Sequence, residues 1–433
     1  MHRITVRDSW IAIVCCLFVL PALAGDWPRF LGPSGDGKST ETGLDLAWPA
    51  TGPPLVWEIE VGDGYTMPAI ADGKLFEFDR REDRARLTCR VAATGKEIWR
   101  QEYPTDYEDL YGYSTGPRGT PVIDGDRIYT YGVEGKLRCH AVKDGKLLWE
   151  VDTVKKFGVV QNFFGVGSTP IIEGDLLIAM VGGSPDDSPG IQSGDVKSAG
   201  TAIVAFDKKT GEVRYATGDD LASYASPVLT TIEGRRWGLM FARGGLFGFD
   251  PKNGKIDFHF PWRSKVLESV NAANPVVAGD RVLISETYGP GSALIRVKPG
   301  GYTLVRKDPP RDKSLASHWA TPILHDGTIY GCSGRNSGDA ELRAIDFDDG
   351  KVAWSKPGLG RVTMIHVQGH LIVLGERGRL FVVEATPAGY TEVSATEPLV
   401  TYPAWNPPVL VNGLLFVRGA DKLRCFDLHA KRE

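Results

Sequence analysis

The amino-acid sequence predicts an all-β fold, an eight-bladed β-propeller, with seven blades as the alternative. Three observations predict it. A block made of a strand, a glycine turn and a Trp, Tyr or Phe recurs about every 49 residues. A strand that opens at a proline after a small residue recurs with the block, and the two chain ends complement each other. A repeat of this length, built from short strands and turns, is typical of propeller blades.

The repeated block is most complete in EGKLRCHAVKDGKLLWE, residues 134–150. It recurs in RLTCRVAATGKEIWR, TAIVAFDKKTGEVRYAT, GGLFGFDPKNGKIDFHF and ELRAIDFDDGKVAWSK. Each copy reads as a strand with alternating side chains, a tight turn that ends in glycine, and an outer strand. We therefore expect every copy to form the outer half of one blade.

The strand openings supply the count of blades. They are TMPAI, GTPVI, STPII, ASPVL, ANPVV, ATPIL, RVTMIH and NPPVL. Proline is tolerated at the first residue of a strand, where no ladder hydrogen bond is lost, and small residues before it suit a crowded central axis. Eight openings predict eight innermost strands. Seven blades stays the alternative because the repeat that begins RVTMIH lacks the proline and the tryptophan.

The chain ends predict how the ring closes. The last repeat, from Asn406 onward, has three strands and no outer one, whereas GPPLVWEIE near the N-terminus is a lone strand. Pairing residues 53–60 with the last repeat would leave no unpaired inner edge. The predicted domains are a signal peptide over 1–24, an extension over 25–52 packed on the propeller, and the propeller over 53–433. Residues 182–200, rich in Gly, Ser, Pro and Asp, are expected to form a long surface loop.

The first 24 residues are typical of a secretory leader. Arg3 and Arg7 precede the apolar segment IAIVCCLFVL, and PALA supplies an Ala-x-Ala site with cleavage after Ala24. An uncleaved membrane anchor is the alternative, but the apolar segment is short for a bilayer span. We therefore expect an exported monomer, periplasmic or associated with the cell envelope, without a transmembrane segment after cleavage.

Charge and cysteine content exclude several function classes. The formal net charge of −4 gives none of the basic field that nucleic-acid binding needs. After the leader the chain keeps Cys89, Cys139, Cys332 and Cys425, with no CxxC or CxxCH spacing. Three of the four occupy the same position in their repeats, too far apart across blades for a disulfide, so we expect small buried side chains.

The segments AATGKEIWR, DKKTGEVRY and FDDGKVAWSK resemble the tryptophan-docking repeat of quinoprotein-type propellers, which bind pyrroloquinoline quinone (PQQ). DWPRFLGPSGDG followed by LAWP and GPPLVWE is similar to the N-terminal part of exported PQQ-like repeat proteins. The resemblance spans almost the whole mature chain and implies that one large side chain per blade docks on the next blade. The expected docking residues are Trp57, Trp99, Trp149, Tyr215, Phe258 and Trp354.

The resemblance implies two classes of function. One comprises PQQ-dependent dehydrogenases of alcohols or sugars, which use a calcium ion, an Asp base and often a vicinal disulfide. The other is similar to the BamB-type outer-membrane assembly factor, which uses its loops to hold other proteins without a cofactor. The only vicinal pair, Cys15-Cys16, lies in the leader. Candidate calcium ligands are scattered: Asp106, Glu108, Asp186, Asp187 and Glu268. No catalytic residue, metal site or cofactor is therefore predicted, although PQQ with calcium stays open.

The mouth of the axial channel is the expected binding site. Segments before the innermost strands carry aromatic, amide and cationic side chains that could bind a protein tail or a sugar. The candidates are Tyr65, Arg118, Gln161, Phe163, Phe164, Tyr224, Asn271, Asn274, His318, Trp319, Trp405 and Asn406. The alternative is that these side chains only fill the channel. The predicted function is a non-catalytic scaffold for protein partners, with a PQQ dehydrogenase or a polysaccharide-binding propeller as alternatives.

Overall fold

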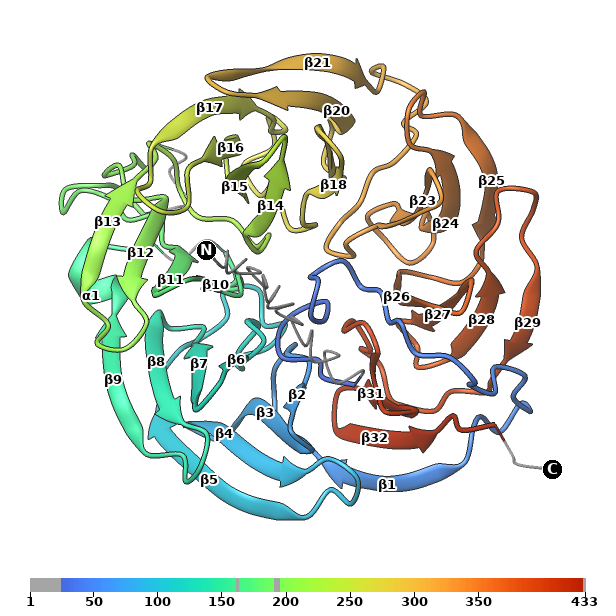
Figure 1. The fold of residues 1–433 in the computed structure, drawn as a ribbon. Coiled ribbons are helices and arrows are strands. Elements are labelled where there is room, and N and C mark those ends of the chain that lie inside the picture. Colours follow the sequence, from blue (N-terminus) through green and yellow to red (C-terminus); the bar gives the residue numbers. More distant parts are fainter. Residues whose placement is uncertain (1–24, 161–162, 191–194, 431–433) are drawn as a thin grey trace, which may run out of the picture.

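Eight antiparallel sheets surround a central axis in the computed structural model, which describes residues 25–160, 163–190 and 195–430 (Figure 1). Each sheet has four strands. The all-β, eight-bladed propeller is therefore confirmed, and the repeat that begins RVTMIH forms a blade of its own. The leader predicted over residues 1–24 lies outside the described residues. Among those described, no helix is long and apolar enough to cross a membrane.

The blades follow one another along the chain, from the innermost strand to the outermost. The first four contain β2 (Ala69–Ala71), β3 (Lys74–Arg81), β4 (Arg84–Val91) and β5 (Glu97–Pro104); β6 (Val122–Asp124), β7 (Arg127–Tyr131), β8 (Lys136–Ala141) and β9 (Leu147–Asp152); β10 (Ile171–Glu173), β11 (Leu176–Met180), β12 (Ile203–Asp207) and β13 (Val213–Thr217); β14 (Val228–Ile232), β15 (Arg235–Phe241), β16 (Gly245–Phe249) and β17 (Ile256–Pro261). A short helix, α1 (Thr153–Phe157), follows β9.

The last four blades repeat the arrangement. They contain β18 (Val276–Ala278), β19 (Arg281–Glu286), β20 (Gly291–Lys298) and β21 (Gly301–Lys307); β22 (Ile323–His325), β23 (Thr328–Ser333), β24 (Glu341–Asp346) and β25 (Val352–Pro357); β26 (Val362–Val367), β27 (His370–Gly375), β28 (Leu380–Glu384) and β29 (Glu392–Ala395); β30 (Val409–Val411), β31 (Leu414–Arg418), β32 (Lys422–Asp427) and, from the other end of the chain, β1 (Leu55–Glu60).

The two ends of the chain meet in the eighth blade. β1 pairs antiparallel with β32, with Trp57 opposite Cys425 and Glu60 opposite Lys422. Figure 1 shows the blue β1 along the outside of the red β32. Because the N-terminal strand completes the C-terminal sheet, hydrogen bonds between strands from the two chain ends close the ring.

Most outer strands carry one large side chain across to the next blade. Trp99 Nε1 donates to the Val142 carbonyl at 3.0 Å, and Trp149 Nε1 donates to that of Lys208 at 3.1 Å. The ring lies against the turn glycine of that blade: a Cβ built on Gly145 would lie 2.6 Å from the Trp99 ring. The same glycine has φ +75°. Both close contact and backbone conformation therefore require glycine, which explains why turn and tryptophan recur together.

Two blades use a polar residue at this docking position. In β21 it is Arg306, whose guanidinium donates to the Phe347 carbonyl at 3.2 Å and lies against Gly350. In β29 it is Ser394, which donates to the carbonyl of Leu46 in the N-terminal extension at 2.9 Å. The extension thus takes the place of a docking ring between the seventh and eighth blades. Sequence reasoning missed both residues because it looked for aromatic side chains.

The extension over residues 25–52 closes one end of the axial channel. Trp27 forms a bridge with Ile70 of the first blade, and Lys38 forms one with His366 of the seventh. Trp27 is 1% exposed. Figure 1 shows this blue segment crossing the centre of the ring before it turns outward to β1. The extension therefore joins the first and seventh blades, which lie on either side of the eighth. The four cysteines of the described chain are buried and free, as expected.

Candidate functional site

An axial cavity of about 340 Å³ opens on the face away from the extension. Its walls come mostly from the loops that connect the outer strand of one blade to the inner strand of the next. Phe30 and Leu31 of the extension line the cavity as well. Because the extension crosses the far end of the channel, we call the cavity a blind cup that opens toward the connecting loops.

Small polar residues join the blades around the cup. The Thr120 N–H donates to Thr169 Oγ1 at 3.0 Å, and the Thr169 N–H donates to Ser226 Oγ at 2.9 Å. The Ser226 N–H then donates to Asn274 Oδ1 at 2.7 Å, and that of Asn274 to Thr321 Oγ1 at 3.0 Å. These are the small residues noted before the strand-opening prolines. They form a chain of hydrogen bonds from blade to blade, and Thr169, Ser226 and Thr321 of this chain also line the cavity.

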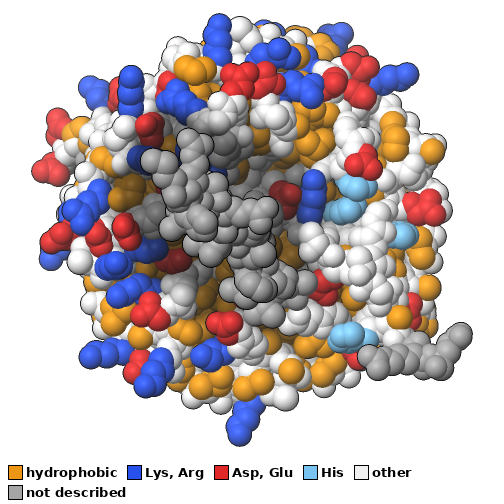
Figure 2. Space-filling view, in the orientation of Figure 1, with side chains coloured by type: hydrophobic (Ala, Val, Ile, Leu, Met, Phe, Trp, Pro, Cys, Tyr) orange, Lys and Arg blue, Asp and Glu red, His pale blue; other side chains and the backbone are white. Residues whose placement is uncertain are grey.

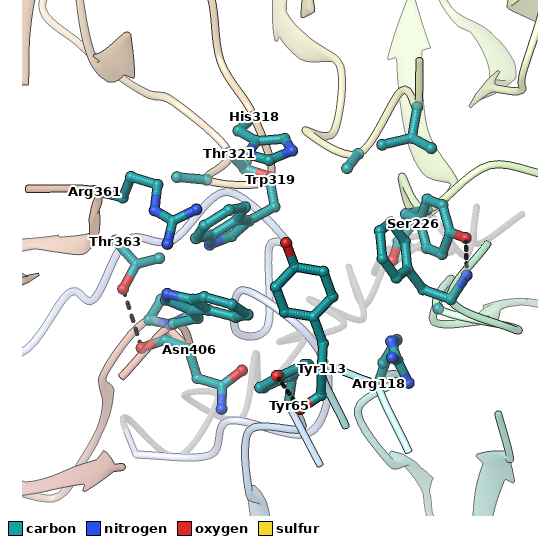
Figure 3. Close-up of a pocket in the computed structure, with 18 of the residues that line it drawn as sticks. Tyr65, Tyr113, Arg118, Ser226, His318, Trp319, Thr321, Arg361, Thr363 and Asn406 are labelled. Carbon is teal, nitrogen blue, oxygen red and sulfur yellow. Dashed lines mark hydrogen bonds between the residues drawn. The ribbon is translucent and has the colours of Figure 1, made fainter. Parts of the chain in front are cut away.

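Aromatic side chains form the walls of the cup. The ring centres of Trp319 and Trp405 are 4.9 Å apart, and those of Tyr65 and Trp405 are 4.9 Å apart. Phe164 and Tyr224 lie together elsewhere on the wall, 5.7 Å between centres. Figure 3 shows Tyr113 projecting into the middle of the cavity, with Trp319 and Arg361 on one side and Ser226 on the other. A compact ligand would therefore meet ring faces on several sides.

The loop that carries Tyr111 and Tyr113 is held by Asp109. One carboxylate oxygen of Asp109 accepts the N–H groups of Tyr111 and Tyr113 at 2.9 and 3.1 Å. The other accepts a hydrogen bond from Arg118 at 2.7 Å, and the Asp109 side chain is fully buried. Arg118 also donates to the carbonyls of Gly116 and Ser114. This ion pair therefore positions the loop, and both of its charges are already used within the protein.

A second ion pair supports the two tryptophans. Arg361 donates two hydrogen bonds to Glu376, at 2.8 and 2.7 Å. Its guanidinium lies 4.7 Å from the Trp319 ring centre and 5.0 Å from that of Trp405, within range of a cation–π interaction. Burial acts to raise the pKa of the Glu376 carboxyl, but hydrogen bonds from Arg361 outweigh it and hold the pKa below its ordinary value. Glu376 is therefore a charged support for the wall.

His318 is a neutral side chain in this wall. Burial and the nearby charges of Arg361 and Arg335 lower its pKa to about 3. Its Nε2 is 3.0 Å from the Tyr288 hydroxyl. The guanidinium of Arg335 lies over the Tyr288 ring, 4.4 Å from its centre. The imidazole of His318 is therefore uncharged near neutral pH. It contributes packing and a hydrogen bond to the wall of the cup.

The structure places eight of the twelve candidate residues on the cup and three beneath or beside it. The eight are Tyr65, Arg118, Phe164, Tyr224, His318, Trp319, Trp405 and Asn406. Phe163 is buried behind the wall, and Asn271 donates to the carbonyls of Ala242, Arg243 and Trp262. Asn274 belongs to the blade-to-blade chain described above. Gln161 lies outside the described residues.

Several residues that line the cup were not among the candidates. They are Tyr111, Tyr113, Glu268, Tyr288, Arg335, Asn336 and Arg361. Tyr288 and Arg335 lie on turns between the two middle strands of their blades, which reach the same face as the connecting loops. The strand order could have located them. In an antiparallel blade every second connection lies on the same face of the ring, so the turns between the second and third strands lie on the face of the connecting loops.

Exposed apolar side chains gather on the loops around the mouth of the cup. We call this set the rim patch: Leu110, Tyr111, Tyr113, Val266 and Tyr402, which are 40–59% exposed. They lie on the connecting loops after β5, β17 and β29. Exposed apolar side chains that gather in one place mark contact surfaces more often than single ones do. On the face drawn in Figure 2, by contrast, Lys and Arg are interspersed with Asp and Glu.

The described residues do not fit a calcium-bound quinone. Across them, no group of three or more His, Cys, Asp or Glu side chains could hold a metal ion. Asp186 and Asp187 are exposed on the long loop of the third blade. Of the proposed ligands only Glu268 lines the cup, and one carboxylate is too few for a calcium ion, which takes about six to eight oxygen ligands.

The fold and the site together define the class of this protein, a closed eight-bladed propeller with a blind axial cup. The family can be stated as well. The family model described as "Outer membrane protein assembly factor BamB" matches residues 49–184 and 83–356, so the chain belongs to this family of PQQ-like propellers. No curated protein matches the sequence.

Solved structures of both expected classes share the fold. BamB from Moraxella catarrhalis has a TM-score of 0.58 at 14% identity, covering 88% of this chain and 98% of that chain. Quinohemoprotein alcohol dehydrogenase from Comamonas testosteroni has a TM-score of 0.64 at 12% identity, covering 94% and 81%. Quinohemoprotein alcohol dehydrogenase ADHIIG from Pseudomonas putida HK5 has a TM-score of 0.55 at 12% identity, covering 95% and 81%. At these identities the likeness is one of fold.

Proposed function

We propose that this protein is an exported, non-catalytic propeller that serves as a scaffold for protein partners in the cell envelope. The rim patch is the observation that carries this proposal. Leu110 and Tyr111 are 49% and 48% exposed on a loop that Asp109 holds in place. A preformed apolar surface binds a partner with little loss of side-chain freedom, so the rim is suited to contact another protein.

The chemistry of the cup supports binding over catalysis. The two acids closest to its arginines, Asp109 and Glu376, are committed to ion pairs that hold the walls. A general base must be free to take a proton, and the Glu376 carboxyl, whose pKa Arg361 helps hold below its ordinary value, is poor at this. His318, with its pKa near 3, is neutral but lies against Tyr288 and Trp319 as part of the wall.

Membership of the family agrees with this proposal, and so does the leader predicted over residues 1–24. A PQQ-dependent dehydrogenase is the second candidate, since quinohemoprotein alcohol dehydrogenases share the fold. The absence of a calcium ligand set among the described residues argues against it.

Addition of PQQ and calcium to the purified mature protein separates the two candidates. Quinone absorbance measures uptake, and dye reduction with alcohols or sugars measures turnover. The scaffold proposal predicts neither stoichiometric uptake of the quinone nor dye reduction. The control is the same titration without calcium. Calcium-dependent, stoichiometric uptake together with turnover would replace the scaffold with an enzyme.

A further inference from the structure

The shape of the cup limits what can enter it. Phe30 and Leu31 form its inner end, so a polymer cannot pass through the axis. A volume of about 340 Å³ is at the lower end of the range for small-ligand pockets. The cup can therefore take only a compact molecule or the end of an extended chain.

The walls of the cup offer ring faces to a ligand. Trp319 and Trp405 are tilted by 48° to each other, and Tyr65 is tilted by 44° to Trp405. These rings form a curved wall instead of a flat slot. A curved wall fits a puckered ring with an apolar C–H face better than it fits a planar aromatic molecule, which stacks between parallel planes.

The polar groups of the cup suit hydroxyl groups. Thr169 and Thr321 each accept an N–H from the neighbouring blade, which leaves their hydroxyl protons free for a ligand. At the mouth, Arg335 supplies a guanidinium and Glu268 a carboxylate, and neither is in an ion pair with another described residue. A donor and an acceptor in one cup can bind neighbouring hydroxyl groups, which both donate and accept.

The charges of the cup favour a neutral ligand. Arg118 is compensated by Asp109 and Arg361 by Glu376. The two remaining charges, those of Arg335 and Glu268, are opposite in sign. An anion would be attracted by Arg335 but repelled by Glu268, and a cation would be attracted by Glu268 but repelled by Arg335. A free peptide terminus carries one full charge, so this balance disfavours it.

We infer that the cup binds the end of a neutral glycan, with roughly one or two sugar rings inside. The sugar ring lies against Trp319, Trp405 and Tyr65, and its hydroxyl groups bind Arg335, Glu268 and the hydroxyls on the wall. This inference deepens the proposed function, since it names a ligand for the cup beneath the rim patch that contacts the protein partner.

Titration with defined oligosaccharides, followed by intrinsic tryptophan fluorescence and calorimetry, tests the inference. The probes are maltotriose, mannotriose and tri-N-acetylchitotriose, with trigalacturonate and an uncapped tripeptide as charged comparisons. We expect at least one neutral trisaccharide to change the emission and to bind with little dependence on salt. Trp405→Ala should weaken that binding by about tenfold or more, as loss of a central aromatic contact does.

Two conservative variants keep the test valid if Trp405→Ala fails to fold. Glu268→Gln and Arg335→Gln lie at the mouth and should each weaken binding several-fold. Glu233→Gln, an exposed acid on a turn of the opposite face, and Arg311→Gln, an exposed arginine outside the cup, should leave it unchanged.

Three results would overturn the inference. They are no binding of any neutral probe at millimolar concentration, tighter binding of trigalacturonate or the tripeptide, or unchanged affinity in the Glu268 and Arg335 variants. Loss of sugar binding while the rim patch still contacts a protein would remove the glycan and leave the scaffold proposal intact. Sugar binding without a protein contact at the rim patch would remove the scaffold proposal and leave the glycan inference intact.

Discussion

Single residues hold neighbouring blades together by a shared rule. The docking side chain must reach the next blade, and in most blades it covers the turn glycine there and donates to one carbonyl. Trp, Tyr and Arg all do this, as Trp57, Tyr215 and Arg306 show with donor distances of 2.9, 2.8 and 3.2 Å. Phe258 has no donor and instead packs its ring against Tyr302, 5.3 Å between centres. The docking position thus requires a side chain long enough to reach the next blade. The sequence pattern identifies only the blades in which that side chain is aromatic.

Trp149→Ala should lower the free energy of unfolding by about 3–5 kcal/mol, because it removes a buried indole and leaves a cavity against Gly211. Denaturant unfolding of the purified protein measures this. Trp149→Phe is the comparison variant: it keeps an aromatic ring but loses part of the indole packing and the hydrogen bond to Lys208, so its cost should be smaller than that of Trp149→Ala. A native state in which a quencher reaches Trp149 freely would contradict the docking role.

His318 should make the protein less stable in acid. Its pKa is lowered from the usual 6.5 to about 3, so the folded state keeps the ring neutral where the unfolded state is protonated. The stabilising contribution is therefore complete above pH 6.5 and is lost as the pH falls toward 3. The loss is at most about 1.4 kcal/mol per pH unit.

His318→Gln tests this pH dependence. Between pH 6.5 and 3, the unfolding free energy of the variant should fall less steeply than that of the parent. Parallel curves for His318→Gln and the parent would show that this histidine is not held neutral.

At the scale of elements, β1 and the extension do two jobs with one stretch of chain. β1 completes the eighth sheet, and the segment before it fills the contact between the seventh and eighth blades through Leu46 and the buried Trp48. The same segment closes the channel with Phe30 and Leu31. The inner end of the cup is therefore formed by the N-terminal extension.

Deletion of residues 25–60 should open the ring and lower the thermal midpoint severely, because β32 loses its partner strand and the core loses Trp27 and Trp57. Thermal unfolding followed by circular dichroism measures the change. A control chain that carries residues 53–60 after the last repeat, on a Gly/Ser linker, should regain much of the midpoint. An unchanged midpoint in the deleted chain would rule out this closure.

The sequence predicts the elements better than it predicts the cup. Prolines at strand openings and glycines in turns are required by the local backbone conformation. The eight inner strands can therefore be predicted from the prolines and the small residues before them. Whether a loop side chain lines a cavity depends on contacts between distant segments. Asn271 and Asn274 have the composition of site residues, yet both are used by neighbouring backbone groups. Arg335 and Tyr288 reach the cup from turns that the pattern did not assign to that face.

At the scale of the whole molecule, one end of the axis is closed and the other is open. The formal net charge of −4 is small for 433 residues, and the face in Figure 2 mixes both signs. Long-range electrostatic steering therefore has little part in partner choice. Recognition depends on the apolar rim patch and on the cup beneath it.

Site-specific photo-crosslinking tests the scaffold proposal most directly. A photoreactive residue at Tyr111, on the rim patch, is compared in intact cells with one at Ile98, an outer-strand position of similar exposure at 46%. We predict a discrete protein adduct from position 111, reproduced at position 402 and absent at position 98. Equal adducts from positions 111 and 98, or none from either rim position while the protein is folded and exported, would contradict the proposal that this face holds a protein partner.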